Sequence, residues 1–147
     1  MKFSFVLGLF LFGSVIYGQE YEKKMFINQT DTLPYRLLLP ENYSPKKSYP
    51  LLIFLHGVGE RGTDNEKQLI HGSTLFTSDD FRKNYPAIVV FPQCPTNSYW
   101  ASVHRSSAKK LKKRFNFNKI LKEFRTQKLL ALLLNDLEES YAIDSSS

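Results

Sequence analysis

Two short apolar runs, at residues 51–55 and 87–91, dominate the hydrophobic pattern of this chain. Each has the length of a β-strand, and neither alternates with polar residues, which predicts strands that are buried on both faces. Such strands are typical of a mainly parallel sheet that helices cover on both sides. The segment between them, residues 65–81, is long enough for a crossover that contains a helix. The pattern therefore predicts an α/β fold.

Two further extended segments, 24–28 and 33–39, come earlier and are joined by the polar residues 29–32, which suits a hairpin. The clearest helix is predicted over 126–141, with Thr126 able to cap its start. One face of this helix carries a stripe of apolar residues at helical spacing. The stripe consists of Leu130, Leu133, Leu134, Leu137 and Tyr141, widened by Leu129.

Residues 1–18 form an apolar leader. Lys2 gives it a positive start and Gly18 is a small residue ahead of Gln19, which indicates a signal peptide that is cut before Gln19. The apolar run is shorter than the ~20 residues needed to span a bilayer. The alternative is an uncut leader that tethers the chain to a membrane. We expect an exported protein, periplasmic or extracellular, whose mature part is residues 19–147 and is not stably inserted in a membrane.

The formal charge of +6 comes from one segment. Residues 105–128 hold ten Lys or Arg and one acid, whereas the rest of the chain has a net charge of −3. Because phenylalanines interleave with these bases, residues 105–125 can form a patch for nucleic acid or anionic lipid, which would make the protein a secreted, non-catalytic binder of polyanions. The alternative is a solvated basic insertion. For an exported protein we favour the insertion and expect no nucleic-acid partner.

The cysteine and histidine content excludes other kinds of site. A single cysteine, Cys94, cannot form an internal disulfide. His56, His71 and His104 are scattered without the spacing of zinc ligands. Cys94 lies in no basic or helix-capping setting that would mark a reactive thiol, so we expect it to be packed. The sequence implies no metal and no organic cofactor.

Candidate chemistry follows the first apolar strand, in the segment 55–62, Leu-His-Gly-Val-Gly-Glu-Arg-Gly. The carboxyl edge of a sheet is where α/β proteins bind their ligands. Glycines there allow a backbone N–H to turn outward. Such a donor stabilises the tetrahedral oxyanion of acyl transfer and is worth about 2.7 to 4 kcal/mol in a measured enzyme. A plain glycine-rich turn is the alternative, and these residues alone do not decide between the two.

The surrounding sequence resembles the secreted esterase and peptidase-like branch of the α/β-hydrolases, related to phospholipase/carboxylesterase and polyhydroxybutyrate-depolymerase-like enzymes. The landmarks, in order, are 33–43, 49–62, Asp64-Asn65, Phe91-Pro92-Gln93-Cys94-Pro95 and Tyr99-Trp100. The resemblance covers residues 33–102 and, more weakly, 126–144. It implies a three-layer α/β sandwich and hydrolysis of a small-molecule ester or peptide by acyl transfer to serine.

The resemblance also implies roles for individual residues. The Val58 N–H is an oxyanion donor, Gly57 and Gly59 shape its loop, and His56 belongs to the scaffold and is not a triad base. Four polar residues brace the loop, although an exposed polar turn is the alternative: Glu60, Arg61, Asp64 and Asn65. Three residues line the mouth of the substrate pocket, although Trp100 can equally be a partly buried aromatic: Gln93, Tyr99 and Trp100.

The nucleophile motif of the family, Gly-x-Ser-x-Gly, is absent, because no two of the seven glycines lie four residues apart. A triad of His56, Asp64 or Asp79, and Ser102 is conceivable, but their spacing does not support it. Residue 147 falls about where the nucleophile strand would begin. We therefore expect the N-terminal part of an α/β-hydrolase domain, truncated before the nucleophile elbow, inactive and poorly folded alone. Its apolar edge would be the strand at 87–91 or its neighbour.

Overall fold

The computed structural model describes residues 20–29, 31–101, 103–105, 115–117 and 125–145. The expected leader at 1–18 and most of the basic insertion at 105–125 lie outside these residues. No helix in the described part of the chain is long and apolar enough to cross a membrane.

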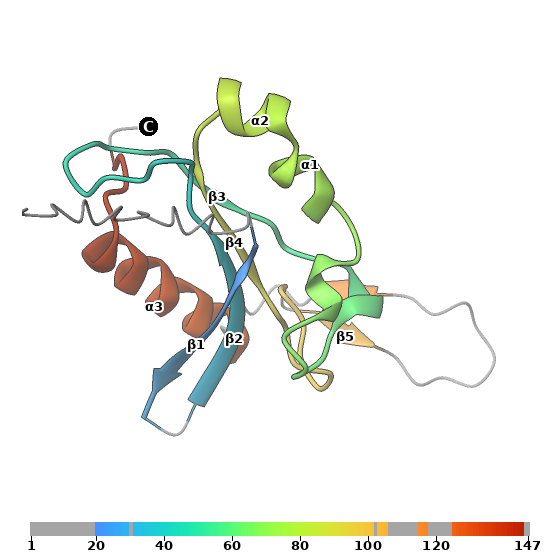
Figure 1. Cartoon of the computed structure of the whole chain (residues 1–147). Coiled ribbons are helices and arrows are strands. Elements are labelled where there is room, and N and C mark those ends of the chain that lie inside the picture. The colour runs from blue at the N-terminus through green and yellow to red at the C-terminus, as the bar shows by residue number, and fades with distance from the viewer. Residues whose placement is uncertain (1–19, 30, 102, 106–114, 118–124, 146–147) are drawn as a thin grey trace, which may run out of the picture.

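A four-stranded mixed sheet forms the centre of the structure (Figure 1). Its order is β1 (Glu22–Asn28), β2 (Asp31–Leu38), β4 (Ile88–Pro92) and β3 (Leu51–Ile53). β1 and β2 form the predicted hairpin, and β2 runs antiparallel to β4. β3 and β4 are parallel neighbours, with Leu52 opposite Val89. Both predicted apolar runs are therefore adjacent parallel strands.

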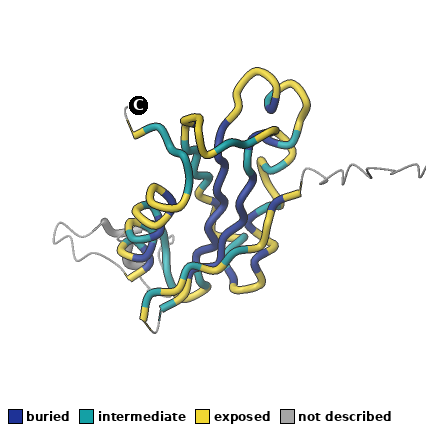
Figure 2. Tube along the Cα trace, turned by 60° about the vertical axis from the view of Figure 1, so that its left-hand side comes forward, coloured by how far each residue is buried: buried dark blue, intermediate teal, exposed yellow. Residues whose placement is uncertain are grey.

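The central strands are buried along most of their length (Figure 2), and alternate residues of these strands supply two apolar layers. On one face, Leu33 and Leu37 of β2 and Val90 of β4 pack against α3 (Arg125–Ser140). The opposite face carries a second cluster, in which Val89 and Phe91 of β4 pack with Phe76 of α1 (Ser73–Thr77), beside α2 (Asp79–Asn84). Helices therefore cover both faces of the sheet, and the three-layer α/β sandwich is confirmed.

The crossover from β3 to β4 consists of short pieces in place of one long helix. Two 3-10 turns, η1 (Val58–Glu60) and η2 (Lys67–Leu69), precede α1 and α2. Gly72 is the N-cap of α1 and has φ 80°, in the left-handed region, where a Cβ would also lie 2.9 Å from the Phe54 ring. Ser78 is extended and separates the two helices, and its Oγ accepts the Phe81 N–H at 3.3 Å.

The buried face of α3 is rotated from the predicted stripe. Leu129 and Leu133 are buried, whereas Leu134 is only half-buried. Thr126, expected to cap the helix, lies within its first turn because α3 begins at Arg125. The Thr126 side chain is buried and its Oγ1 donates to Ser98 Oγ at 2.6 Å. The buried face of α3 thus includes a polar residue, which a search for apolar residues alone does not find.

β1 and β3 are the two edge strands of the sheet, because β2 and β4 lie between them. The edge beside the 87–91 run is thus its neighbour β3, whose three residues are half-buried. Just ahead of β3, Tyr49 pairs in parallel with Ile143: its N–H donates to the Ala142 carbonyl and its carbonyl accepts the Asp144 N–H, both at 2.9 Å. A separate two-stranded sheet pairs β5 (Val103–Arg105) with β6 (Phe115–Phe117).

The rotation of α3 is testable by truncating two of its leucines. Leu129→Ala should lower the free energy of unfolding by about 2 to 5 kcal/mol, because the change opens a cavity under a buried side chain. Leu134→Ala should cost less than half as much, since Leu134 already contacts water. Denaturant titration of both variants measures the difference. Equal losses, or a larger loss at Leu134, would place the predicted stripe against the sheet and contradict the structure.

Candidate functional site

The loop that follows β3 presents a free backbone donor. The Phe54 N–H still bonds the Val90 carbonyl at 2.9 Å, and the chain then leaves the sheet. Gly57 is extended, with φ −76° and ψ −176°, and η1 begins at Val58, whose side chain is exposed. The first N–H groups of a helical turn have no partner within it. Among the described residues no acceptor bonds the Val58 N–H, so it is available at the carboxyl end of β3.

His56 clamps the start of the loop. Its Nε2 accepts the Cys94 N–H at 3.0 Å, and its Nδ1 lies 2.6 Å from the Gly57 carbonyl. Nε2 must therefore be unprotonated, with the proton on Nδ1. Burial lowers the pKa of His56, which favours the same neutral form. Both ring nitrogens are engaged, neither with Asp64 or Asp79, and Ser102 lies outside the described residues.

The side chain of Gln93 ties the far side of the loop to β4. Its Nε2 donates to the Glu60 carbonyl at 3.2 Å and to Asp64 Oδ1 at 2.8 Å, and its Oε1 accepts the Asn65 N–H at 2.7 Å. Gln93 was expected to line the pocket mouth, and in the structure its side chain is fully buried beneath the loop. The Gln93 N–H bonds the Pro34 carbonyl at 2.8 Å, so the residue continues the sheet ladder and its side chain stays beneath the loop.

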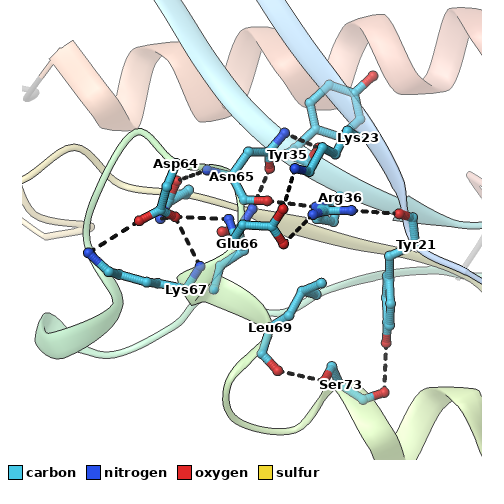
Figure 3. Close-up of polar contacts among 12 residues, drawn as sticks. Tyr21, Lys23, Tyr35, Arg36, Asp64, Asn65, Glu66, Lys67, Leu69 and Ser73 are labelled. Atoms are coloured by element: carbon cyan, nitrogen blue, oxygen red, sulfur yellow. Dashed lines mark hydrogen bonds and ion pairs between the residues drawn. The ribbon is translucent and has the colours of Figure 1, made fainter.

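A buried arginine holds the end of the loop against β2 (Figure 3). The Arg36 guanidinium donates from Nε to the Asn65 carbonyl at 2.7 Å and from Nη1 to the Tyr21 carbonyl at 2.9 Å. Its third nitrogen pairs with Glu66, which also pairs with Lys23. Arg36 lies at the middle of the central sheet, so this contact joins the loop to the core.

Asp64 and Asn65 order the backbone around that contact. Asp64 Oδ1 accepts the Glu66 and Lys67 N–H groups at 2.9 and 3.0 Å, and these bonds, with that from Gln93, lower the pKa of Asp64. Asn65 has φ 56°, which an asparagine adopts at low cost. Its Nδ2 donates to the carbonyls of Lys24 and Tyr35, at 3.0 and 3.3 Å.

Arg61 joins the loop to the segment that follows β4. Its Nε donates to the Val58 carbonyl at 3.1 Å and its Nη1 to the Ser98 carbonyl at 2.9 Å. The guanidinium lies 4.4 Å over the Tyr99 ring, a cation–π contact. Glu60 makes a different contact, with one carboxylate oxygen 3.5 Å from His71 Nε2.

The two aromatic residues expected at the pocket mouth lie beside the loop. The indole of Trp100 donates to the His56 carbonyl at 3.1 Å and meets the His56 ring edge-on, with ring centres 5.3 Å apart. Tyr99 and Trp100 are both half-buried. The described residues also line an open cavity of about 420 Å³ between the hairpin, residues 95–98 and the start of α3. Neither aromatic lines that cavity, and the loop contributes only Thr63 to it.

Cys94 is a packed side chain, as the sequence indicated. Its side chain has no exposed surface, and burial raises the pKa of the thiol to about 11, so the sulfur stays protonated. The backbone of Cys94 matters more, because its carbonyl accepts the Gly62 N–H at 2.9 Å. In the described part of the chain, no three His, Cys, Asp or Glu side chains come together as metal ligands.

The close fit of the loop is testable with two glycines. A Cβ at Gly62 would lie 2.9 Å from Gln93 Nε2, whose bonds prevent it from moving away, whereas a Cβ at Gly59 would meet nothing within 4 Å. Gly62→Ala should therefore lower the free energy of unfolding by about 1 to 3 kcal/mol. Gly59→Ala should be neutral or slightly stabilising. Thermal unfolding compares them, and a neutral Gly62→Ala would contradict the packing of Gly62 on Gln93.

The neutral state of His56 predicts a dependence of stability on pH. The folded pKa lies below the ordinary value of 6.5, so the unfolded chain takes up the proton first. The contribution of His56 is complete above pH ~6.5 and declines as the pH falls towards the folded pKa. The melting temperature should drop between pH 7.5 and 5.5, above the range in which carboxylates titrate. His56→Gln should flatten this part of the curve, and an unchanged slope would contradict the assignment of a neutral His56 in the folded state.

Comparison with known proteins gives one family. Residues 30–142 match the sequence model of the family described as "Putative esterase". The crystal structure of a thermostable esterase superposes with a TM-score of 0.68 at 29% identity, over 84% of this chain and 31% of that one. A CE1 ferulic acid esterase from Anaeromyces mucronatus, in complex with ferulic acid, gives 0.50 at 20% identity, over 87% of this chain and 46% of that one.

The same fungal enzyme in the absence of substrate gives the same TM-score and identity. No curated protein sequence matches the chain. The chain spans about a third of the length of the thermostable esterase and less than half of the length of the fungal enzyme.

Proposed function

Because the chain belongs to the esterase family of the α/β-hydrolases, we propose that it supplies the oxyanion-hole loop of a carboxylic-ester hydrolase that acts by acyl transfer to serine. The observation that carries the proposal is the N–H of the exposed residue Val58, which has no partner among the described residues and follows the carboxyl end of β3. Peptide-type acyl groups fall within the same chemistry, since their tetrahedral intermediates carry the same oxyanion.

The chemical role of the loop is to receive negative charge. When a nucleophile attacks an ester carbonyl, the carbonyl oxygen becomes an oxyanion, and an N–H already aimed at that position stabilises it without reorganising. Gly57 and Gly59 are both exposed, and no atom crowds the missing side chain of Gly59. Gly59 thus leaves room for the substrate, whereas a Cβ at Gly57 would lie 3.0 Å from Glu60 Oε2. Tyr99 and Trp100, half-buried beside the loop, are the aromatic surface we propose for the organic part of the ester.

The proposal includes export and a missing nucleophile. Residues 1–18 direct the chain to the periplasm or the exterior. No Gly-x-Ser-x-Gly occurs in the sequence, so the nucleophile is not supplied by these residues and the chain alone does not hydrolyse esters.

A rival function, binding of polyanions or anionic membranes, is favoured by the net charge of +9 on residues 105–128. Steep weakening of polyanion binding by salt would support it.

A chimera tests the role of the Val58 N–H. Residues 20–147 replace the matching part of the thermostable esterase, and hydrolysis of a short-chain ester is measured. In this chimera Val58→Pro removes the N–H alone, because Pro fits the first position of a helical turn and Gly57 is already extended. We expect kcat to fall about 100- to 1000-fold with little change in KM. The isolated chain should show no hydrolysis above the buffer blank.

Val58→Ala is the matched control, since it shortens the same exposed side chain but keeps the N–H. It should retain most of the activity of the chimera. Equal kcat values for Val58→Pro and Val58→Ala would show that this N–H does not stabilise the oxyanion. Hydrolysis by the isolated chain that a serine-directed phosphonate stops would show instead that the chain holds its own nucleophile.

A further inference from the structure

We propose that Gln93 is the residue that positions the Val58 N–H, acting through the Glu60 carbonyl. The inference rests on the proposed function, because positioning this donor matters only if the donor meets an oxyanion. Gln93 does not touch the donor itself. It is a positioning residue that lies under the loop and fixes the position of the η1 turn relative to the sheet.

The hydrogen-bonding capacity of the Gln93 amide is directed entirely at the loop. The two Nε2 hydrogens go to Glu60 and Asp64, and Oε1 accepts the Asn65 N–H. Three points of the loop, spread over six residues, therefore meet on one side chain. Because that side chain has no exposed surface, no water can replace these bonds without opening the loop.

The loop is shaped around this amide. Glu60, which accepts from Nε2, is the last residue of η1 and lies two residues after Val58. Gly62 lies against the same nitrogen, at a position where any Cβ would come within 2.9 Å. The contact between loop and amide is therefore too close for a side chain at residue 62.

Gln93 is itself held by the most buried strand. Its N–H bonds the Pro34 carbonyl of β2, and the five β4 residues before it are all buried. The next residue, Cys94, holds His56 through its N–H and Gly62 through its carbonyl. Gln93 and Cys94 thus bond both ends of the loop. Because both residues directly follow β4, these bonds restrain the position of the Val58 N–H relative to the sheet.

An amide is the group that this position requires. The neighbouring Asp64 carboxylate accepts from Nε2 at 2.8 Å, so a carboxylate at residue 93 would face another carboxylate and would lose both donors. Repulsion between the two would raise the pKa of the new carboxyl, and its protonated form would recover one donor. Gln93→Glu should therefore release the loop at neutral pH and restore it in part on acidification. Gln93→Leu should release the loop at any pH.

The test measures the amide N–H signals of Val58 and Gly59 by NMR in the full chain. Gln93→Leu should shift both signals towards random-coil positions and raise the fast mobility of residues 58–62. Gln68→Leu is the matched control. Gln68 is an equally buried glutamine, but its Nε2 donates to Asn65 Oδ1 and its Oε1 has no partner among the described residues. The control should lose stability at most and leave Val58 and Gly59 unchanged.

If Gln93→Leu does not fold, Gln93→Glu provides the decision. The wild-type spectrum is recorded at each pH as the reference. As the pH falls from 7 to 5, the Val58 and Gly59 signals of Gln93→Glu should move towards the wild-type positions. Val58 and Gly59 signals of Gln93→Glu that do not change with pH would overturn the proposal. A Gln93→Leu spectrum in which these signals match those of Gln68→Leu would also overturn it. Neither result depends on ester hydrolysis. The role of Gln93 and the role of the Val58 N–H therefore fail separately.

Discussion

The loop after β3 cannot hold its own shape, and most of the candidate site follows from that constraint. Three of the six residues from Gly57 to Gly62 are glycines. Glycine has little steric preference for one backbone conformation and loses much entropy when fixed. The side chains that restrain the loop therefore come largely from outside it. The amide of Gln93, the guanidinium of Arg36 and the clamp between His56 and Cys94 are the principal ones.

This arrangement couples the candidate site to the core of the protein. β4 is buried along its whole length between β2 and β3, and the bracing residues Gln93 and Cys94 follow it directly. Arg36 comes from β2, an inner strand of the sheet. A donor that must not move during a reaction is thus attached to the part of the fold that opens least readily. The attachment also sets chemical conditions, since His56 must be neutral to accept and Asp64 must be ionised to receive its several donors.

Much of the fold was predictable because burial on both faces leaves a strong pattern. The runs at 51–55 and 87–91 are apolar without interruption, and the hairpin before them is marked by a polar turn. The face of α3 was harder, because the buried Thr126 is polar and its partner Ser98 is far away in the sequence. The broken crossover depends on Gly72 and Ser78, whose effects on two short helices are local and weak in the sequence.

The candidate loop was found from its glycines and from the family resemblance, whereas the bracing role of Gln93 was not predicted. A glutamine after a buried strand gives no sign of whether it faces a pocket or the underside of a loop. That choice depends on the Pro34 carbonyl of a different strand and on the space beneath Gly62. Only the register between β2 and β4 brings these groups together. The spacing of residues along the sequence does not predict the register between β2 and β4.

Amide hydrogen exchange of the intact chain tests most directly whether a free donor is held by a rigid loop. The N–H groups of Gly62, Asn65 and Cys94 all have buried or part-buried acceptors and should exchange far more slowly than in an unfolded chain. The Val58 N–H should exchange at nearly the unprotected rate in the same sample. Protection at Val58 would mean that the donor already has a partner. Unprotected Gly62 and Asn65 would mean that the loop is not held, and either result would contradict the structure described for this site.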